Sequence, residues 1–547
     1  MRDLAYLKLL SREYPNIRAA ASDIINLQAI CGLPKGTEYF FSDLHGEHEA
    51  FIYLLRSSSG IIREKIRETF GHIISEEDEV RLANLIYYPE KMINQIKQAN
   101  EYTEDWQKTA VYRLVQICRE VSSKYTRSKV RKKMPKEFSG VIDELLYVDN
   151  TDDNKTEYYS ELINTLIDVR VADSFIVVIC SLIRSLTIDN LHILGDIFDR
   201  GPRPDIILEE LMHFHDVDIQ WGNHDISWMG AATGNRACIC NVLRMALGYN
   251  GFDVLEDGYG INLRPLSMFA ERVYRDDPCT CFLPQILDKN IYDAVDPKLA
   301  AKMHKAIAVL QYKEEGQIIK RHPEYGMEER ILLSAIRYDR GTVTIDGKEY
   351  PMRDMNFPTV DPADPLRLTD EEEELLHTLE LSFRHNARLH EHVRFLYSNG
   401  SMYKCCNSNL LYHGCIPMTE NREFDGLMVG GKMYRGKELM DFIDTQVKNA
   451  YFLPEDAPEK EACRDFMWYL WNGAKSPVFG KDKNRSFEHY FIEDPEVMRE
   501  TMNPYYQLSE EEETCDMILK EFGLPTKGSH IINGHMPVKI KSGETPI

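Results

Sequence analysis

The sequence predicts an α/β fold with large helical insertions. Short β-like runs alternate with long helical stretches, five of these runs end in a polar turn, and the 547 residues contain no internal repeat. Short apolar runs followed by glycine-containing turns are typical of buried strands whose loops gather along one edge of a sheet. Because open α/β architectures bind ligands at that edge, the functional residues are expected there.

The five strand-like runs each lead directly into residues that carry carboxylate, amide or imidazole groups. The runs and the motifs after them are 38–41 with SDLHG, 191–194 with GDIFDRG, 217–221 with GNHD, 410–412 with HGC, and 530–532 with NGH. A lone D-x-H is weak evidence, since chance matches are common, but five such motifs in order at strand ends indicate one shared site.

The segments between these runs are predicted to be mainly helical. Residues 162–186 are apolar with helical spacing. Thr369 with Glu372, and Ser509 with Glu512, have the spacing of capping boxes that open helices. The acidic residues after them are then first-turn residues favoured by the helix dipole, and we do not count them as metal ligands.

The net charge and the apolar segments of the chain limit the partners and the cellular location that we expect. The net charge is −23, so the chain repels nucleic acid and anionic membranes at long range, and we expect neither as a partner. The first eleven residues do not resemble a signal peptide, and the most apolar run, 175–182, is too short to span a bilayer. The protein is therefore expected in the cytoplasm. Any phosphate that it binds needs a local positive centre, which a metal ion can supply.

Two further features are interpreted as structural. Cys238/Cys240 and Cys279/Cys281 lack the C-x-x-C spacing of zinc sites, and the twelve cysteines are expected to be reduced thiols. The basic run 124–136 contains seven lysines and arginines. Nucleic-acid binding is one interpretation of this run, but a solvated helix face is favoured because the chain is acidic and the run has few aromatic residues.

The motif residues match the requirements of phosphate ester hydrolysis. A pair of metal ions roughly 3.5–4 Å apart can activate water and clamp the phosphoryl oxygens, and it needs carboxylate, imidazole and carbonyl ligands, one of them bridging. The chain offers carboxylates, imidazoles and one amide oxygen at the strand ends, namely Asp43, His45, Asp196, Asn223, His413 and His535. His413 and His535 could each be an ordinary core histidine, but the other three motifs favour a metal-binding role.

The same motifs also offer groups for proton transfer and phosphate binding. His224 directly follows Asn223 and is placed to be the general acid. Asp199 could hold that imidazole in the required tautomer, and Arg200 offers a guanidinium fork for phosphate oxygens.

These motifs resemble those of the metallophosphatase superfamily, in its phosphoprotein-phosphatase-like branch, with its D-x-H-G, G-D-x-x-D-R-G, G-N-H-(E/D), H-G and final G-H blocks. Longer stretches are similar to the class III fructose-1,6-bisphosphatases over essentially the whole chain. These stretches are GDIFDRGPRPDIIL, IQWGNHDISWMGAATGNRACICNV, FAERVYRDDPC, SPVFGKDKNRSFEHYF and NGHMPVKIKSGETPI.

The resemblance implies a four-layer α/β/β/α metallophosphatase sandwich, with two sheets face to face and large helical insertions. On that basis residues 1–50, 186–250 and 400–547 form a discontinuous core, and residues 51–185 and 251–399 are helical insertions. A dinuclear metal site, usually loaded with manganese, is then expected at the strand ends.

The resemblance also implies a role for each site residue. One metal ion is expected on Asp43, His45 and Asp196, and the other on Asp196, Asn223, His413 and His535, so that Asp196 bridges them. His224 is expected to act as general acid with help from Asp199, while Arg200 holds phosphate. The reaction is hydrolysis of the 1-phosphate of fructose 1,6-bisphosphate in gluconeogenesis. Lys481 and Arg485, in the segment 476–490, are further candidates for substrate contacts.

One departure from the family pattern keeps alternatives open. Family members usually continue after the fifth motif with another β-like segment and a glycine-rich turn, whereas this sequence ends at Ile547, so a shortened chain is expected. The alternatives are a protein phosphatase or a dinucleoside polyphosphate hydrolase on the same dinuclear site, or a truncated non-catalytic remnant. Whether the chain forms a homo-oligomer is left open.

Overall fold

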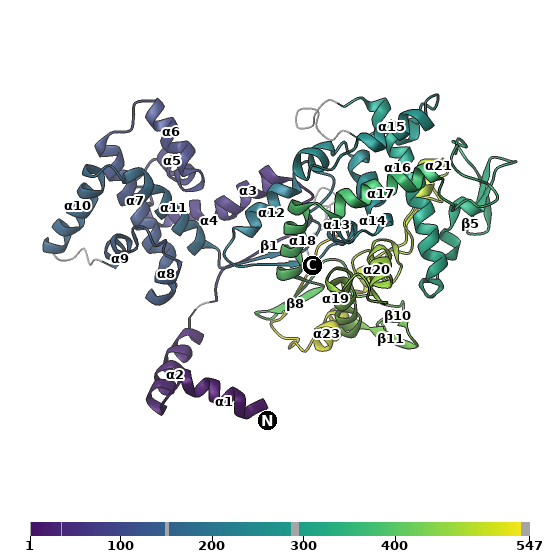
Figure 1. The fold of residues 1–547 in the computed structure, drawn as a ribbon. Helices are drawn as coiled ribbons and strands as arrows, with labels where there is room; N and C mark the ends of the chain where they lie inside the picture. The colour runs from purple at the N-terminus through teal and green to yellow at the C-terminus, as the bar shows by residue number, and fades with distance from the viewer. Residues whose placement is uncertain (1, 34, 148–152, 286–294, 538–547) are drawn as a thin grey trace. The chain divides into compact units, whose positions relative to one another are not determined.

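The computed structural model describes residues 2–33, 35–147, 153–285 and 295–537 (Figure 1). The last ten residues of the stretch NGHMPVKIKSGETPI, 538–547, lie outside the described residues. The chain divides into two compact units, the first comprising residues 1–39 and 52–191 and the second residues 40–51 and 192–547.

The first unit is helical. Its buried core gathers apolar side chains from α4 to α11, such as Ile66, Val111, Leu114 and Phe175. Figure 1 shows α5, α6, α7 and α11 side by side in this group. The helices of this unit are α1 (Arg2–Glu13), α2 (Ile17–Cys31), α4 (Ile61–Phe70), α5 (Glu76–Tyr87), α6 (Pro89–Gln98), α7 (Glu104–Ser122), α8 (Arg127–Lys133), α9 (Ser139–Tyr147), α10 (Asp153–Asp168) and α11 (Ala172–Thr187).

The basic run 124–136 contributes to the interior of the first unit rather than to a solvated face alone. Asp189 is buried, and its carboxylate lies 2.8 Å from the Lys129 ammonium, 3.7 Å from that of Lys133 and 3.9 Å from that of Lys124. The backbone N–H of Thr37 donates to the same carboxylate. The prediction of a solvated helix face is therefore corrected for these three lysines, because they neutralise the buried charge of Asp189.

The second unit combines helices with four small sheets. One sheet has the strand order β1 (Glu38–Phe41), β2 (Asn190–Ile193), β3 (Val217–Gln220) and β7 (Gly400–Ser401), and another has the order β12 (His530–Ile532), β9 (Asn409–Tyr412) and β8 (Tyr403–Cys406). The β3–β7 and β12–β9 pairs are parallel. The remaining strands form a three-stranded antiparallel sheet and a hairpin, namely β4 (Ile336–Arg337), β5 (Thr342–Ile345), β6 (Lys348–Pro351), β10 (Gly426–Val429) and β11 (Lys432–Arg435).

Helices of the second unit pack around these sheets. The long helix α16 contacts α14 and α15, and α13 contacts α14 and α20. The helices are α12 (Pro204–Met212), α13 (Asn223–Thr233), α14 (Arg236–Gly248), α15 (Arg264–Val273), α16 (Pro297–Arg321), α17 (Asp370–Arg384), α18 (Ala387–Asn399), α19 (Gly436–Phe452), α20 (Lys460–Asn472), α21 (Ser486–Phe491), α22 (Tyr505–Leu508) and α23 (Glu512–Glu521). Helix α3 (His48–Ser57) begins in the second unit and ends in the first.

The five predicted strands are confirmed to within one residue at each end, as β1, β2, β3, β9 and β12. The structure is therefore a mixed α/β fold with parallel strand pairs. Each of the five strands leads into its motif, as predicted.

The predicted helix boundaries are less accurate than the predicted strands. Residues 162–186 form parts of two helices, because the chain leaves the helical conformation after Asp168 and resumes it at Ala172. Thr369 does form the capping box of α17 with Glu372. The capping box at Ser509 is wrong, since Ser509 ends α22 and its hydroxyl donates to the Tyr506 carbonyl oxygen instead.

Two expectations about the whole chain can be compared with the described residues. All twelve cysteines lie within them, and each is a free thiol. In the same described ranges, no helix has both the length and the apolar character needed to cross a membrane.

Candidate functional site

The five motifs meet around the carboxylate of Asp196, which is 2% exposed. Asp196 Oδ2 lies 3.3 Å from His413 Nε2 and 4.0 Å from His45 Nε2. The backbone N–H of His224 donates to Asp196 Oδ1 at 3.1 Å, and His535 Nδ1 lies 3.1 Å from His413 Nε2. Four imidazoles therefore surround one carboxylate.

The first and fifth motifs are joined through Asp43. The backbone N–H of His535 donates to Asp43 Oδ2 at 3.0 Å, while Asp43 Oδ1 lies 3.9 Å from His45 Nε2. The Ser42 hydroxyl donates to the same carboxylate. Residues almost five hundred positions apart in the chain thus come together at one edge of the site.

The donor atoms form two overlapping groups. In one, donor atoms of His45, Asp196 and His224 lie within 4.8 Å of one another, and in the other those of Asp196, His413 and His535 do so. Asp196 belongs to both groups. This is the arrangement that two ions with one bridging carboxylate require.

The orientation of three imidazoles fits metal binding. His45 Nδ1 lies 3.1 Å from the Phe198 carbonyl oxygen, His413 Nδ1 lies 2.5 Å from that of Leu194, and His535 Nε2 lies 3.1 Å from that of Phe479. Because a carbonyl oxygen only accepts, each ring is assigned an N–H there, which leaves its other nitrogen aimed at Asp196 or its neighbours. Metal-ligating histidines are held by such carbonyl contacts.

This assignment has a direct consequence between His413 and His535. Their facing nitrogens are 3.1 Å apart, and both present lone pairs when each ring donates its other N–H to a carbonyl. Two facing acceptors repel, and a shared cation or a proton relieves the repulsion. Burial lowers the pKa of His413, but the charge of Asp196 raises it more, to about 9, so a proton is favoured where a cation would otherwise stand.

Asn223 provides a further test of the fit. Its side-chain oxygen is buried and has no hydrogen-bond partner among the residues that the structure describes. An unsatisfied buried amide oxygen costs about 1–3 kcal/mol, and a metal ion would satisfy it. Together with the hard oxygen and imidazole donors around it, this oxygen suits a first-row divalent ion. The residues present therefore fit the predicted metal pair.

His224 is held as a general acid would be. Its Nδ1 lies 2.7 Å from Asp199 Oδ2, and Trp228 Nε1 donates to the other Asp199 oxygen at 2.8 Å. Burial lowers the pKa of His224, but the charge of Asp196 and the bond to Asp199 outweigh it, so the pKa is raised. The second nitrogen, Nε2, is left for the site, and His224 also belongs to one donor group.

The other site groups respond to burial and to one another. Burial raises the pKa of Asp196, but the charges of His413, His224 and His45 hold it well below its usual range. Burial lowers the pKa of His45 and of His535 to about 4. The arrangement therefore favours an ionised carboxylate at Asp196 and neutral rings at His45 and His535, which are the protonation states that metal ligands need. His413 favours a proton in the absence of a cation, and a bound cation would displace that proton.

The backbone of the site lies largely in the left-handed region. Six motif residues other than glycine have φ between 43° and 70°, namely Asp43, His45, Asp196, Asp199, Arg200 and His535. Such residues cost about 1–3 kcal/mol each and cluster at functional sites. Gly195 is needed for close approach, because a Cβ there would lie 2.7 Å from the His413 ring and 2.5 Å from the Gly222 nitrogen.

Asp225 is a structural residue of the site that the sequence analysis did not assign. Its carboxylate accepts hydrogen bonds from the backbone N–H groups of Asp196 and Ile197 at 2.8 Å and of Gly222 at 2.9 Å. It thereby ties the GDIFDRG and GNHD turns together. Its place in the GNHD motif was the available signal, but the sequence does not distinguish an anchoring carboxylate from a ligand.

A cavity of about 960 Å³ adjoins the predicted metal ligands. Asp43, His45, Asp196, Asn223, His224 and His535 line it together with Arg200 and Lys481, whose ammonium lies 2.5 Å from Glu500. Arg485 is not among the lining residues. Its guanidinium contacts Glu488 at 3.2 Å and Asp346 at 3.4 Å, whereas its neighbours Asn484 and Ser486 do line the cavity.

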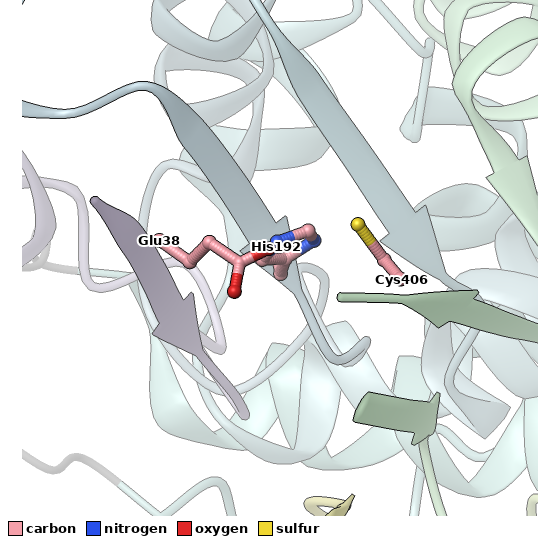
Figure 2. A group of neighbouring side chains, drawn as sticks. All are labelled: Glu38, His192 and Cys406. Carbon is pink, nitrogen blue, oxygen red and sulfur yellow. The ribbon is translucent and has the colours of Figure 1, made fainter. Parts of the chain in front are cut away.

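A separate pair of donor residues lies on the sheets. Figure 2 shows the side chains of His192 on β2 and Cys406 on β8. His192 Nδ1 already lies 2.8 Å from Asp218 Oδ2. The third labelled residue, Glu38, belongs to the first unit, and two donor atoms within the second unit are fewer than a structural metal site requires, so we assign no function to this group.

Comparison with known proteins assigns almost the whole chain to one family. The family model described as "Firmicute fructose-1,6-bisphosphatase" matches residues 5–547. The chain belongs to this family. A protein of Clostridium tetani named fructose-1,6-bisphosphatase class 3 is 51% identical over 545 residues, and one of Bacteroides fragilis with the same name is 50% identical over 546. In both comparisons all of this chain is covered, together with 82% of the relative's length.

The match to the fructose-1,6-bisphosphatase family includes every motif described above, since they all lie between residues 38 and 535. No solved structure matches the chain.

Proposed function

We propose that the protein hydrolyses the 1-phosphate of fructose 1,6-bisphosphate to fructose 6-phosphate and phosphate, as a step of gluconeogenesis. The observation that carries this proposal is the pair of donor groups that share Asp196 beside a cavity, in a chain of the fructose-1,6-bisphosphatase family. A fructose-1,6-bisphosphatase is a phosphoric monoester hydrolase, and the site chemistry suits such an enzyme.

The metal-binding residues are assigned to two ions of manganese. Asp43, His45 and Asp196 would hold one ion, and Asp196, Asn223, His413 and His535 the other. When bound, such a pair lowers the pKa of water and neutralises the charge of the phosphoryl group.

His224 would donate a proton to the leaving sugar oxygen. The carboxylate of Asp199 keeps a proton on His224 Nδ1, so that the proton on Nε2 faces the cavity. The raised pKa of His224 favours the protonated form that a general acid needs. Arg200, which lines the cavity, would hold phosphate oxygens with its guanidinium.

The substrate contacts extend to the segment around α21. Lys481 lines the cavity and would contact the sugar phosphate, while Arg485 would act by holding Asn484 and Ser486 in place through its carboxylate partners. We further propose that the two larger sheets form the centre of a four-layer metallophosphatase sandwich. In this fold residues 1–50, 186–250 and 400–547 are the core and residues 51–185 and 251–399 the insertions. The support is the strand order and the meeting of five strand ends at Asp196.

A substrate panel tests the proposal. The 547-residue chain with manganese would be given fructose 1,6-bisphosphate, a phosphopeptide and a dinucleoside polyphosphate at equal concentration, and the products would be identified by phosphorus NMR. We expect fructose 6-phosphate to form with the highest kcat/KM. A higher kcat/KM on the phosphopeptide or the dinucleotide would refute the assigned substrate and leave the dinuclear site in place.

A further inference from the structure

The cavity contains one buried cation that the proposed mechanism does not use. Arg244, on α14, lines the cavity and is 6% exposed. Its guanidinium forms no ion pair with any carboxylate in residues 2–33, 35–147, 153–285 and 295–537. A compensating carboxylate is Glu315. Burial lowers the pKa of Arg244 and the charge of Glu315 helps to raise it, but Glu315 is joined to Arg244 only through the side chain of Gln311. A buried charge without a direct ion pair is costly, and an anionic ligand would compensate it.

Other buried cations of the second unit are paired. The Lys305 ammonium lies 2.5 Å from Asp277 and 2.6 Å from Asp354, and the Lys313 ammonium lies 2.7 Å from Glu372. Arg330 lies 2.6 Å from Glu488. Arg244 therefore differs from these residues because it has no direct ion pair with a carboxylate among the described residues, and this leaves its charge available to an anion.

The guanidinium of Arg244 is held rigidly by neutral groups. Its Nε donates to Gln311 at 2.7 Å, one terminal nitrogen donates to Asn241 at 2.8 Å, and the other donates to the Tyr490 hydroxyl at 3.2 Å. An arginine has five N–H groups, so one N–H on each terminal nitrogen is not used by the described residues. Each terminal nitrogen can therefore donate one N–H to a phosphate oxygen, as in guanidinium–phosphate pairs.

Tyr490 is itself fixed as an acceptor toward Arg244. His304 Nδ1 lies 2.9 Å from the Phe282 carbonyl oxygen, and its Nε2 lies 2.9 Å from the Tyr490 hydroxyl. Burial lowers the pKa of His304 to about 3, so the ring is neutral and its Nε2 accepts the hydroxyl proton. The Tyr490 oxygen then accepts from the guanidinium and helps to orient it before any ligand binds.

We infer that Arg244 binds the second, non-reacting phosphate of the sugar bisphosphate and so makes the site selective for bisphosphates over monophosphates. This inference rests on the proposed function, because it places the reacting phosphate at the Asp196 cluster in the same cavity. Lys481 would contribute to the same substrate contact, but its ammonium already has Glu500 as a partner, so the main counter-charge is assigned to Arg244. Arg485 is paired with carboxylates that do not line the cavity.

The test compares two substrates that differ only in the second phosphate, fructose 1,6-bisphosphate and fructose 1-phosphate. For Arg244→Gln we expect KM for the bisphosphate to rise about 10- to 100-fold, the range for lost hydrogen bonds to a charged group. The kcat/KM for fructose 1-phosphate should stay within about twofold. The control is Arg236→Gln on the same helix, because Arg236 is paired with Glu373 and Glu380 and does not line the cavity.

A second variant keeps the test decisive if Arg244→Gln does not fold. Tyr490→Phe removes only the hydroxyl that orients Arg244, and it should raise KM for the bisphosphate several-fold without changing hydrolysis of fructose 1-phosphate. Equal losses on both substrates, or no loss in either variant, would overturn the inference while the wild-type activity still supported the proposed function. The inference also requires that the wild type prefers the bisphosphate. It would be overturned if the wild-type chain hydrolysed fructose 1-phosphate as efficiently as fructose 1,6-bisphosphate.

Discussion

Buried charge is arranged in opposite ways in two clusters, one around Asp189 in the first unit and one around Asp196 in the second. In the first unit the ammonium groups of Lys124, Lys129 and Lys133 gather at the carboxylate of Asp189, so the charges are compensated within the chain. In the second unit four imidazoles surround Asp196, and Asn223 has a buried amide oxygen without a partner among the described residues. Arg244 forms no direct ion pair with a described carboxylate, and its hydrogen bonds go to neutral groups. A charge-rich stretch of sequence is therefore a poor sign of a binding site, whereas uncompensated polar groups around a cavity are a good one.

The largest effect is expected at the centre of the uncompensated cluster. Asp196→Asn should lower kcat for phosphate release by more than about 10³-fold, since the bridging carboxylate serves both proposed ions. Metal content, measured by plasma emission after gel filtration, should fall in the same variant. Asp218→Asn is the matched control, because Asp218 is also buried but binds His192 and Lys404 away from the cavity. Full activity of Asp196→Asn would remove the basis of the proposed site.

A somewhat smaller effect is expected for the proposed acid. His224→Ala should lower kcat by about 10²- to 10³-fold, within the range for loss of a general acid, while metal content stays near that of the wild type. His392→Ala, which removes a buried histidine bonded to Tyr259, should leave kcat unchanged. Loss of metal from His224→Ala would instead assign His224 as a ligand, a role that its place in one donor group also allows.

The compensated cluster should affect stability rather than rate. Asp189→Asn leaves the lysines without their counter-charge and should lower the free energy of unfolding by about 1–3 kcal/mol, measured by urea denaturation. Its kcat should be unchanged. Asp143→Asn, which breaks only the more exposed pair with Arg131, should lower the free energy of unfolding by less than about 1 kcal/mol. A loss of activity in a folded Asp189→Asn protein would contradict the contrast drawn between the two clusters.

The smallest expected effect is a change with pH in the stabilisation that Asp189 provides. Burial raises the pKa of Asp189, but its bonds to Lys129 and Tyr125 lower it more, so the folded-state pKa lies below the unfolded value. The stabilisation by Asp189 is therefore present above the unfolded pKa of about 3.9 and is lost as pH falls through the folded value. The difference in unfolding free energy between wild type and Asp189→Asn should shrink in a urea series from pH 6 to pH 3. A difference that grew toward low pH would have the wrong sign.

The sequence predicted the strands and the ligand types but not the way the site is held. The five strand ends could be read from apolar runs followed by Asp, Asn, His and Gly, and local patterns of this kind are visible in one dimension. The roles of Asp225, Trp228 and Arg244 depend on hydrogen bonds between segments distant in the chain, and a sequence does not show these. Ser509 shows that a local pattern can also mislead. Its spacing to Glu512 fits a capping box, but Ser509 directly follows the end of α22 at Leu508 and does not begin a helix.

The most direct test of the account is a manganese titration of the chelator-treated 547-residue chain, with bound metal and phosphate release from fructose 1,6-bisphosphate measured in the same samples. We predict no release without metal and a rise in rate that reaches its plateau when two ions are bound per chain. Full activity in excess chelator, or a plateau with no bound metal, would contradict the assignment of the Asp196 cluster as a dinuclear site.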